Sequence, residues 1–366
     1  MIKEGKFGVQ EAVCLVTITI CTKIFFTSPA FLTRLVGTAV WYTTLISAAT
    51  AIVAFTIVYL LLKRFPGKNL IEVFDNSMGR FFGFIFSFAF AVLFLMDAGM
   101  ALREFTEVLR TYTFQYTQSS LIEGAFVITV GIAAFSGLES IARVSRLLGF
   151  ILLFTYILAI AFSAQNFHLK YLFPILGYGL DKTVIHGLVR SSVYGEVVVL
   201  AVFASSLQGI KNIKKAGYIS LILSGIILSL GLLSFIMVFP YFSLEELTAP
   251  MYSMTRLIKY GTFFTRIDPL FLLLWNISTF ISLSVLFYAA VSIYCKIFRL
   301  QDKRPIIVPM TVVFFASTMA PRDFSSIVYG VLQQFREYSW VIFFGLPLIA
   351  FITAVLRKKK GEKSNA

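Results

Sequence analysis

Residues 14–34 read CLVTITICTKIFFTSPAFLTR, an apolar run of membrane-spanning length with polar residues in its middle. Lys23 lies between apolar stretches, and Thr27, Ser28 and Pro29 follow it closely. A helix needs about 20 apolar residues to cross the ~30 Å hydrocarbon core, and proline interrupts a helix because it lacks an N–H and crowds the preceding turn. The stretch predicts a membrane helix that unwinds at its centre. The alternative is an ordinary proline kink, with Lys23 snorkelling or paired to a carboxylate.

The rest of the chain is equally apolar, which excludes an ordinary soluble protein. It has 366 residues, 58% hydrophobic and 14% charged, with a mean hydropathy of +0.86. Soluble domains carry roughly 25% charged residues. We therefore predict an all-α integral membrane protein in one polytopic domain (1–356) with a basic tail (357–366). The about ten predicted spans cover 9–33, 39–62, 80–110, 120–142, 144–165, 188–207, 215–240, 267–297, 305–320 and 336–356.

The basic residues indicate membrane topology and not nucleic-acid binding. The net charge is +14, but the Lys and Arg residues lie in short gaps between apolar runs. Most of the 32 fall at the N-terminus, in alternate loops and in the tail. Because basic loops stay in the cytoplasm and attract anionic headgroups, we expect both termini to be cytoplasmic and to contact membrane lipid. We expect no nucleic-acid partner. The first apolar stretch lacks a following cleavage site, so we expect a retained span.

Residue types that support catalysis or metal binding are scarce. The three Cys residues lie in apolar segments without CxxC spacing, and the two His residues share one loop, 166–187. No Walker lysine loop, GxGxxG, HExxH or GxSxG motif is present. We therefore expect no disulfide, metal site, cofactor or enzymatic activity.

The sixth predicted span contains a second polar interruption, within GLVRSSVYGEVVVL (187–200). If the helices form two inverted five-helix repeats, about 9–165 and 188–356, the first and sixth spans occupy corresponding positions. Two such interrupted helices point to a binding site at the membrane midplane. Free N–H groups there suit a carboxylate and free carbonyls suit a cation, although Gly and Ser also serve ordinary helix packing. The candidate ligand-binding residues are Thr22, Lys23, Thr27, Ser28, Ser192, Tyr194, Gly195 and Glu196.

Other polar residues inside spans are candidates for ion coupling or charge pairing. Asp97 lies deep in span three, whereas Arg103, Glu104, Glu107 and Arg110 lie toward its outer end, where Arg103 and Glu107 have the spacing of a helix ion pair. Asp97 and Glu196 are each possible counter-ions for Lys23. In span eight, polar side chains either coordinate a cation or join helices. The coupling or counter-ion candidates are Asp97, Asn276, Ser278 and Ser282.

Two long connections, 166–187 and 241–266, face outward in the predicted topology. The first is rich in Pro, Gly and aromatic residues, and the second contains an amphipathic, helix-like segment. We expect each to form either a lid or re-entrant element over the bundle or a solvated linker.

Several motifs occur in a characteristic order along nearly the whole chain. They are FFTSPAFL, KRFPGKNLIEVF, LREFTEVL, GLESIARVSRLL, YGEVVVL, RIDPLFLLLWNIS and QDKRPIIVP. Together they resemble the B subunit of bacterial spore-germination nutrient receptors, within the amino acid–polyamine–organocation transporter superfamily. The resemblance implies a LeuT-like fold of five plus five helices with discontinuous helices 1 and 6. It also implies residence in the inner membrane of a spore, in a complex with an A subunit and a lipoprotein C subunit.

The resemblance further implies that the protein senses a small nutrient, often an amino acid, and signals germination. The alternative is a proton- or cation-coupled amino acid permease. A third hypothesis is that the assembled complex passes ions as a channel. Carried over by position, the ligand-facing stretches are Thr22–Ser28 and Ser192–Glu196. Family members often have small or apolar residues where this chain has Lys23. Its ammonium can therefore occupy the place of a ligand amine or cation.

Overall fold

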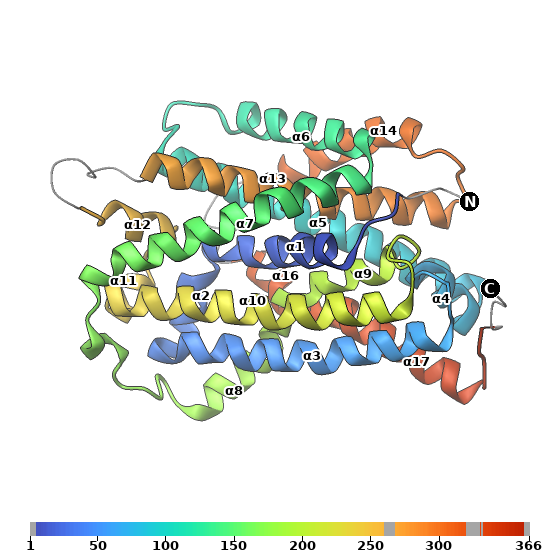
Figure 1. Ribbon diagram of the computed structural model, residues 1–366, viewed down its shortest axis with the longest axis horizontal. Helices are drawn as coiled ribbons and strands as arrows, with labels where there is room; N and C mark the ends of the chain where they lie inside the picture. The colour runs from blue at the N-terminus through green and yellow to red at the C-terminus, as the bar shows by residue number, and fades with distance from the viewer. Residues whose placement is uncertain (1–4, 260–267, 320–329, 331, 362–366) are drawn as a thin grey trace.

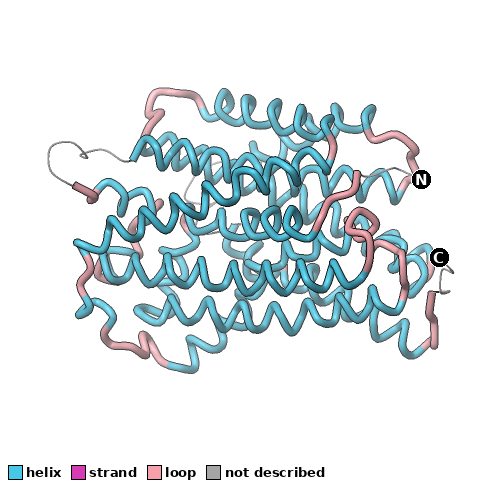
Figure 2. The backbone as a smooth tube through the Cα atoms, in the orientation of Figure 1, coloured by secondary structure: helices cyan, strands magenta, loops and turns pink. Residues whose placement is uncertain are grey.

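The apolar segments form long helices that lie side by side and are joined by loops (Figures 1 and 2). This computed structural model describes residues 5–259, 268–319, 330 and 332–361. Within these ranges no strand occurs, and eight helical segments are long and apolar enough to cross a membrane. The predicted all-α integral membrane class is therefore confirmed.

The ten predicted spans correspond to the following helical segments. The first comprises α1 (Val9–Cys21), the 3-10 helix η1 (Thr22–Phe25) and α2 (Ser28–Val36). After the short η2 (Gly37–Ala39), spans two to five are α3 (Val40–Arg64), α5 (Arg80–Tyr112), α6 (Ser119–Ser136) and α7 (Leu138–Ser163). The sixth comprises α8 (Leu180–Val189), the 3-10 helix η5 (Arg190–Val198) and α9 (Val199–Val202). The rest are α10 (Ile210–Val238), α13 (Asp268–Ile297), α14 (Arg304–Met319) and a last span of α16 (Leu332–Tyr338), the π-helical η7 (Val341–Gly345) and α17 (Leu346–Leu356).

Shorter helices lie in the connections. They are α4 (Leu70–Met78), η3 (Ala164–Asn166), η4 (Leu169–Leu172), α11 (Tyr241–Leu244) and α12 (Pro250–Arg256). We did not predict α4, although its start has a sequence signature. The Asn69 side chain accepts from the Glu72 N–H at 3.1 Å, and the Glu72 carboxylate accepts from the Asn69 N–H at 3.0 Å. This capping box satisfies two backbone donors that a helix start leaves free.

Five predicted boundaries were wrong by five residues or more. The fifth span begins at Leu138 rather than at 144, and the seventh begins at Ile210 rather than at 215. The fourth helix ends at Ser136, not at 142, because Gly137 follows with φ +85°, a conformation that glycine adopts without steric cost. The sixth span begins at Leu180, since the end of the predicted loop 166–187 forms α8 and packs against α3. It ends at Val202 rather than at 207. Part of the second long connection (260–266) and the end of predicted span nine lie outside the described residues.

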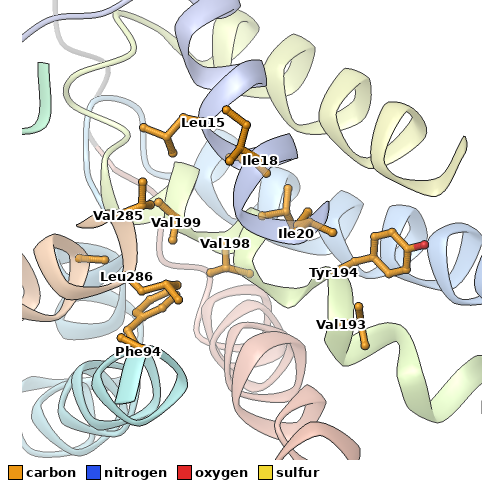
Figure 3. Close-up of a cluster of buried hydrophobic side chains, with 14 of the residues drawn as sticks. Leu15, Ile18, Ile20, Phe94, Val193, Tyr194, Val198, Val199, Val285 and Leu286 are labelled. Carbon is orange, nitrogen blue, oxygen red and sulfur yellow. The ribbon is translucent and has the colours of Figure 1, made fainter. Parts of the chain in front are cut away.

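The centre of the bundle lies where α1, η5, α5 and α13 meet. Figure 3 shows Leu15 and Ile20 of α1, Phe94 of α5, Val198 of η5 and Leu286 of α13 in one buried cluster. The apolar stretch of α13 is 78% buried inside the protein, whereas that of α7 is only 17% buried. Helix α13 is therefore central, and α7 presents its apolar side chains to lipid. α1 begins and α17 ends at the same end of the bundle (Figure 1).

Candidate functional site

The first span is broken where the sequence predicts. α1 ends at Cys21, η1 follows, and Phe26 is extended with φ −100° and ψ −161°. α2 then begins at Ser28, with Pro29 in its first turn. Proline suits that position because a first-turn N–H has no acceptor within the helix. The predicted discontinuous helix 1 is confirmed, and the simple kink is not what forms.

The sixth span is broken at the matching place. The nine residues of η5, RSSVYGEVV, form a 3-10 helix between α8 and α9, and all of them are buried. A 3-10 stretch of this length inside a span is uncommon and marks hinges or functional sites. The predicted discontinuity of helix 6 is therefore confirmed, and it faces the break in helix 1.

Lys23 joins the two breaks. Its Nζ lies 2.8 Å from Glu196 Oε1 and donates to the Val193 carbonyl at 2.9 Å. Lys23 is 8% exposed and Glu196 is 1% exposed. We call the arrangement in which Lys23 holds the two breaks together the closed arrangement. A buried charge without a partner is costly, so this contact stabilises the closed arrangement only while both partners are present. Of the two possible counter-ions for Lys23, the structure selects Glu196.

Asp97 lies next to Glu196 of that pair. It projects from α5, is 6% exposed, and lies close enough to Glu196 for the two carboxyl groups to interact electrostatically. Asp97 Oδ2 and Glu196 Oε2 are both buried without a hydrogen-bond partner in the part of the chain that the structure describes. Two such acceptors side by side can share a proton or accept a donor from a bound molecule.

A second buried ion pair was missed by the sequence reasoning. Arg336 Nη2 lies 2.6 Å from Glu104 Oε2, and Glu104 is completely buried. Glu104 also accepts from the Thr27 N–H at 2.9 Å and from the Thr27 hydroxyl. The sequence places Glu104 toward the charged outer end of span three and Arg336 at the start of the last predicted span, and neither is among the predicted site residues. The available signal was that both lie within otherwise apolar segments.

Arg190 is the third cation at the site, and it lies within the sixth predicted span although it was not among the predicted site residues. It is 2% exposed at the start of η5, and its Nη2 donates to Ser28 Oγ at 2.8 Å. The guanidinium lies over the Phe31 ring, 5.4 Å from its centroid. Its Nη1 is buried and has no hydrogen-bond partner within the described ranges.

The remaining sixth-span candidates fasten η5 to its neighbours. The Ser192 hydroxyl donates to the Arg336 carbonyl. The Tyr194 hydroxyl lies 2.9 Å from Thr44 Oγ1 and 3.1 Å from the Thr44 carbonyl, which ties η5 to α3. Gly195 packs so closely on η7 that a Cβ there would overlap the Phe343 ring. These three residues position the break.

The span-eight candidates make local contacts. Asn276 Nδ2 donates to the Leu272 carbonyl at 2.6 Å, and Ser278 Oγ donates to the Trp275 carbonyl at 3.0 Å, both within α13. The Thr22 hydroxyl donates to Ile18 O at 2.7 Å and reaches Ser278 O at 3.4 Å. Ser282 is buried. No group of three or more His, Cys, Asp or Glu residues in the described ranges could hold a metal ion.

Two small cavities flank the break in helix 1. The smaller one, of about 30 Å³, lies between the two breaks and α3 and is named the polar cavity for the five polar residues among its mainly apolar lining: Lys23, Ser28, Thr44, Ser47 and Arg190. A more apolar one of about 70 Å³ lies toward α7 and α13, lined in part by Thr22, Phe25, Tyr156 and Trp275. Since about 10–15 Å³ of such a volume accommodates one water, the polar cavity admits only a small group.

The end of the bundle opposite the termini is covered by the two long connections. Arg34 of α2 donates to the Glu245 carbonyl at 3.0 Å and pairs with Glu246 at 3.1 Å. The Tyr178 hydroxyl donates to Glu245 Oε1 at 3.0 Å. Desolvation and the adjacent Glu245 carboxylate raise the pKa of Tyr178 to about 12, so the phenol stays protonated and able to donate. These contacts hold the two connections together and fasten the second one to α2.

The sequence matches one known family over most of its length. A family model described as "Spore germination protein" matches residues 9–326. Spore germination protein KB of Bacillus subtilis (strain 168) is 27% identical over 335 residues, covering 90% of each chain. Spore germination protein B2 of the same organism is 21% identical over 370 residues, covering 98% of each chain.

The fold matches that of a solved transporter. The chain superposes on Mhp1, a nucleobase-cation-symport-1 family transporter solved in a closed conformation with bromovinylhydantoin bound, with a TM-score of 0.73. The match covers 97% of this chain and 79% of that chain, at 15% sequence identity. At that identity the likeness establishes the fold and nothing about the ligand.

Proposed function

Since the chain belongs to the spore germination protein family, we propose that it is the nutrient-sensing subunit of a spore germinant receptor. In this proposal a small nutrient binds at the midplane, between the breaks of helices 1 and 6, and its binding signals germination. The family resemblance adds the expectation that the nutrient is an amino acid. The ligand-facing stretches are Thr22–Ser28 and Ser192–Glu196.

One observation carries the proposal: Lys23 holds the two breaks together through Glu196 and Val193 beside a polar cavity. A ligand that competes for any of these groups changes the free-energy difference between the closed arrangement and a rearranged one. A ligand shifts such an equilibrium only by its differential affinity for the two states. The closed state, which Lys23 holds, therefore suits a sensor that stays inactive until a ligand binds.

The test is germination of spores that lack the gene, scored nutrient by nutrient, with complementation by the parent, Lys23→Ala, Glu196→Gln and the exposed control Lys211→Ala. We expect the deletion to abolish the response to one nutrient set. The two site variants should shift the dose dependence while reaching the membrane in parental amounts, and the control should match the parent. Normal germination of the deletion strain in a background without other receptors of this family would refute the sensing function.

A proton- or cation-coupled amino acid permease is the second candidate. It is favoured by the fold shared with a cation-symport transporter and by three ionisable groups, Lys23, Asp97 and Glu196, buried inside the bundle. Such groups inside spans mark ion and proton pathways. Uptake of labelled amino acids into proteoliposomes under a pH gradient separates the two: saturable, gradient-dependent uptake supports the permease, and its absence supports the sensor.

We also propose that the protein resides in the spore inner membrane with A and C subunits, with both termini cytoplasmic. The distribution of Lys and Arg residues supports this orientation. The single substitutions Lys358→Cys and Phe242→Cys, in a background without the three native cysteines, test it. A membrane-impermeant maleimide should label the Phe242→Cys protein from outside intact protoplasts and leave the Lys358→Cys protein unlabelled. Copurification from spore membranes tests the partners.

A further inference from the structure

The chain itself already occupies the place that a ligand ammonium would take. In a broken-helix site, free carbonyls and a carboxylate receive a cation. Here the Val193 carbonyl and Glu196 both accept from Lys23 Nζ, at 2.9 and 2.8 Å. A ligand ammonium would have to displace a covalently attached one whose effective concentration is far higher. The site therefore does not need an ammonium on its ligand.

The chain also occupies the anion position at the start of α2. The Thr27 N–H, which would otherwise face a ligand carboxylate, donates to Glu104. The other oxygen of Glu104 lies 2.6 Å from Arg336, so this carboxylate has both oxygens engaged. A ligand anion must therefore find its donors elsewhere.

Within the described ranges, Arg190 is the buried cation near the two breaks whose N–H groups are not all paired. It lies at the start of the second break and is almost completely buried. The titratable groups close enough to act on it electrostatically include His186, Arg336, Glu337 and Glu104. Glu104 already serves Arg336, and Glu337 forms no ion pair with Arg190 in the described part of the chain. Arg190 thus has one hydrogen bond, to Ser28, and an Nη1 without any among the described residues. A buried guanidinium with an unpaired N–H group is costly, and a bound anion would supply the missing acceptor.

The surroundings of Arg190 suit a carboxylate. Arg190 lines the polar cavity with Lys23 and Ser28, and the cavity of about 30 Å³ admits only a compact group. The Lys23 ammonium has three protons and uses two of them here, and the Ser28 hydroxyl keeps its own proton while it accepts from Arg190. All three residues can therefore donate to one small anion. Arginine in particular binds carboxylates through paired N–H groups.

We propose that Arg190 is the recognition residue for a ligand carboxylate and that Lys23 takes the place of the ligand ammonium. The ligand class is then small carboxylates, with or without an amino group. The assignment rests on the proposed function only in placing the ligand at the midplane cavity.

Binding to the purified full-length protein in lipid nanodiscs tests this assignment, with intrinsic tryptophan fluorescence and thermal shift as readouts. The probes are propionate, L-lactate, L-alanine, L-alaninamide and chloride. We expect propionate, L-lactate and L-alanine to bind with affinities within about tenfold of one another, and L-alaninamide to show no binding. Binding that requires an ammonium, chloride binding that carboxylates do not displace, or no binding of any carboxylate would each overturn the proposal.

Variants then connect the carboxylate to Arg190. Arg190→Gln should weaken propionate binding at least tenfold, whereas Arg304→Gln, an exposed arginine, should bind as the parent does. Lys23→Met frees Val193 and Glu196, so the affinity ratio of L-alanine to propionate should rise at least tenfold. This ratio is measured within one variant and is independent of how much protein folds. An unchanged ratio in Lys23→Met, or parental propionate binding by Arg190→Gln, would contradict the assignment.

These binding results are separable from the sensing function. Spores in which deletion abolishes a nutrient response while the purified protein ignores carboxylates would keep the sensor and remove the Arg190 assignment. Carboxylate binding by the purified protein together with normal germination of the deletion strain would keep the site and remove the sensor.

Discussion

Neutralising Lys23 should destabilise the protein far more than neutralising any exposed lysine. Lys23→Met keeps most of the side-chain volume and removes the ammonium that holds Glu196 and Val193. Glu196 is 1% exposed and then lacks its counter-charge. Removing one partner of a buried ion pair costs about 3–5 kcal/mol, and we expect a loss in that range for Lys23→Met and likewise for Glu196→Gln.

The double variant makes the prediction specific to the pair. Replacing both partners of a buried pair is often close to neutral, so Lys23→Met/Glu196→Gln should lose about 0–2 kcal/mol, well below the sum of the single variants. The free energy of unfolding would be measured in lipid bicelles by steric trapping, with Lys211→Met as the exposed control.

Two results would refute this reasoning. One is a Lys23→Met protein as stable as the Lys211→Met control, which would mean that the ammonium contributes nothing to the closed state. The other is strict additivity of the single variants, because the losses expected for the single and double variants imply a coupling energy of at least about 4 kcal/mol between these residues in direct contact.

Three further variants test other parts of the site. Glu104→Gln should cost about 3–5 kcal/mol of unfolding free energy, measured in the same assay, because its buried partner Arg336 loses the carboxylate that neutralises it. Gly195→Val should sharply reduce the yield of folded protein in size-exclusion chromatography because its side chain overlaps Phe343, and adding Phe343→Ala should restore part of it. Tyr178→Phe should speed hydrogen exchange in 241–247 about fivefold, the effect of losing one hydrogen bond of about 1 kcal/mol to Glu245. This last difference should persist below about pH 10, because the raised pKa of Tyr178, about 12, keeps its phenol protonated, and it should vanish as the pH rises through 12.

Much of the fold could be predicted because hydropathy and backbone chemistry act locally. Runs of about 20 apolar residues define spans wherever they occur, and Pro29 predicts the break in helix 1 regardless of what surrounds it. The same local logic would have found α4 from its capping box. It failed at Gly137, because an apolar helix can continue or stop at a glycine and hydropathy does not distinguish the two outcomes.

The charge pairs of the site could not be predicted from the sequence. The sequence showed that Lys23, Asp97 and Glu196 lie inside spans, which places each of them along its own helix. It did not show how each helix is rotated about its axis or which helices are neighbours. For that reason the choice of Glu196 over Asp97 as the partner of Lys23 came only from the structure.

By itself, then, the sequence determined that this is a membrane protein of about ten helices with breaks in the first and sixth, because burial in lipid imposes length and hydrogen-bonding rules on each segment separately. The tertiary structure decided which buried charges neutralise one another and which is left over. Glu104 pairs with Arg336 across 232 positions of the chain, and Arg190 keeps an N–H group unused by the described residues. Such pairings depend on distances of a few ångströms between helices, and no local pattern of residues encodes those distances.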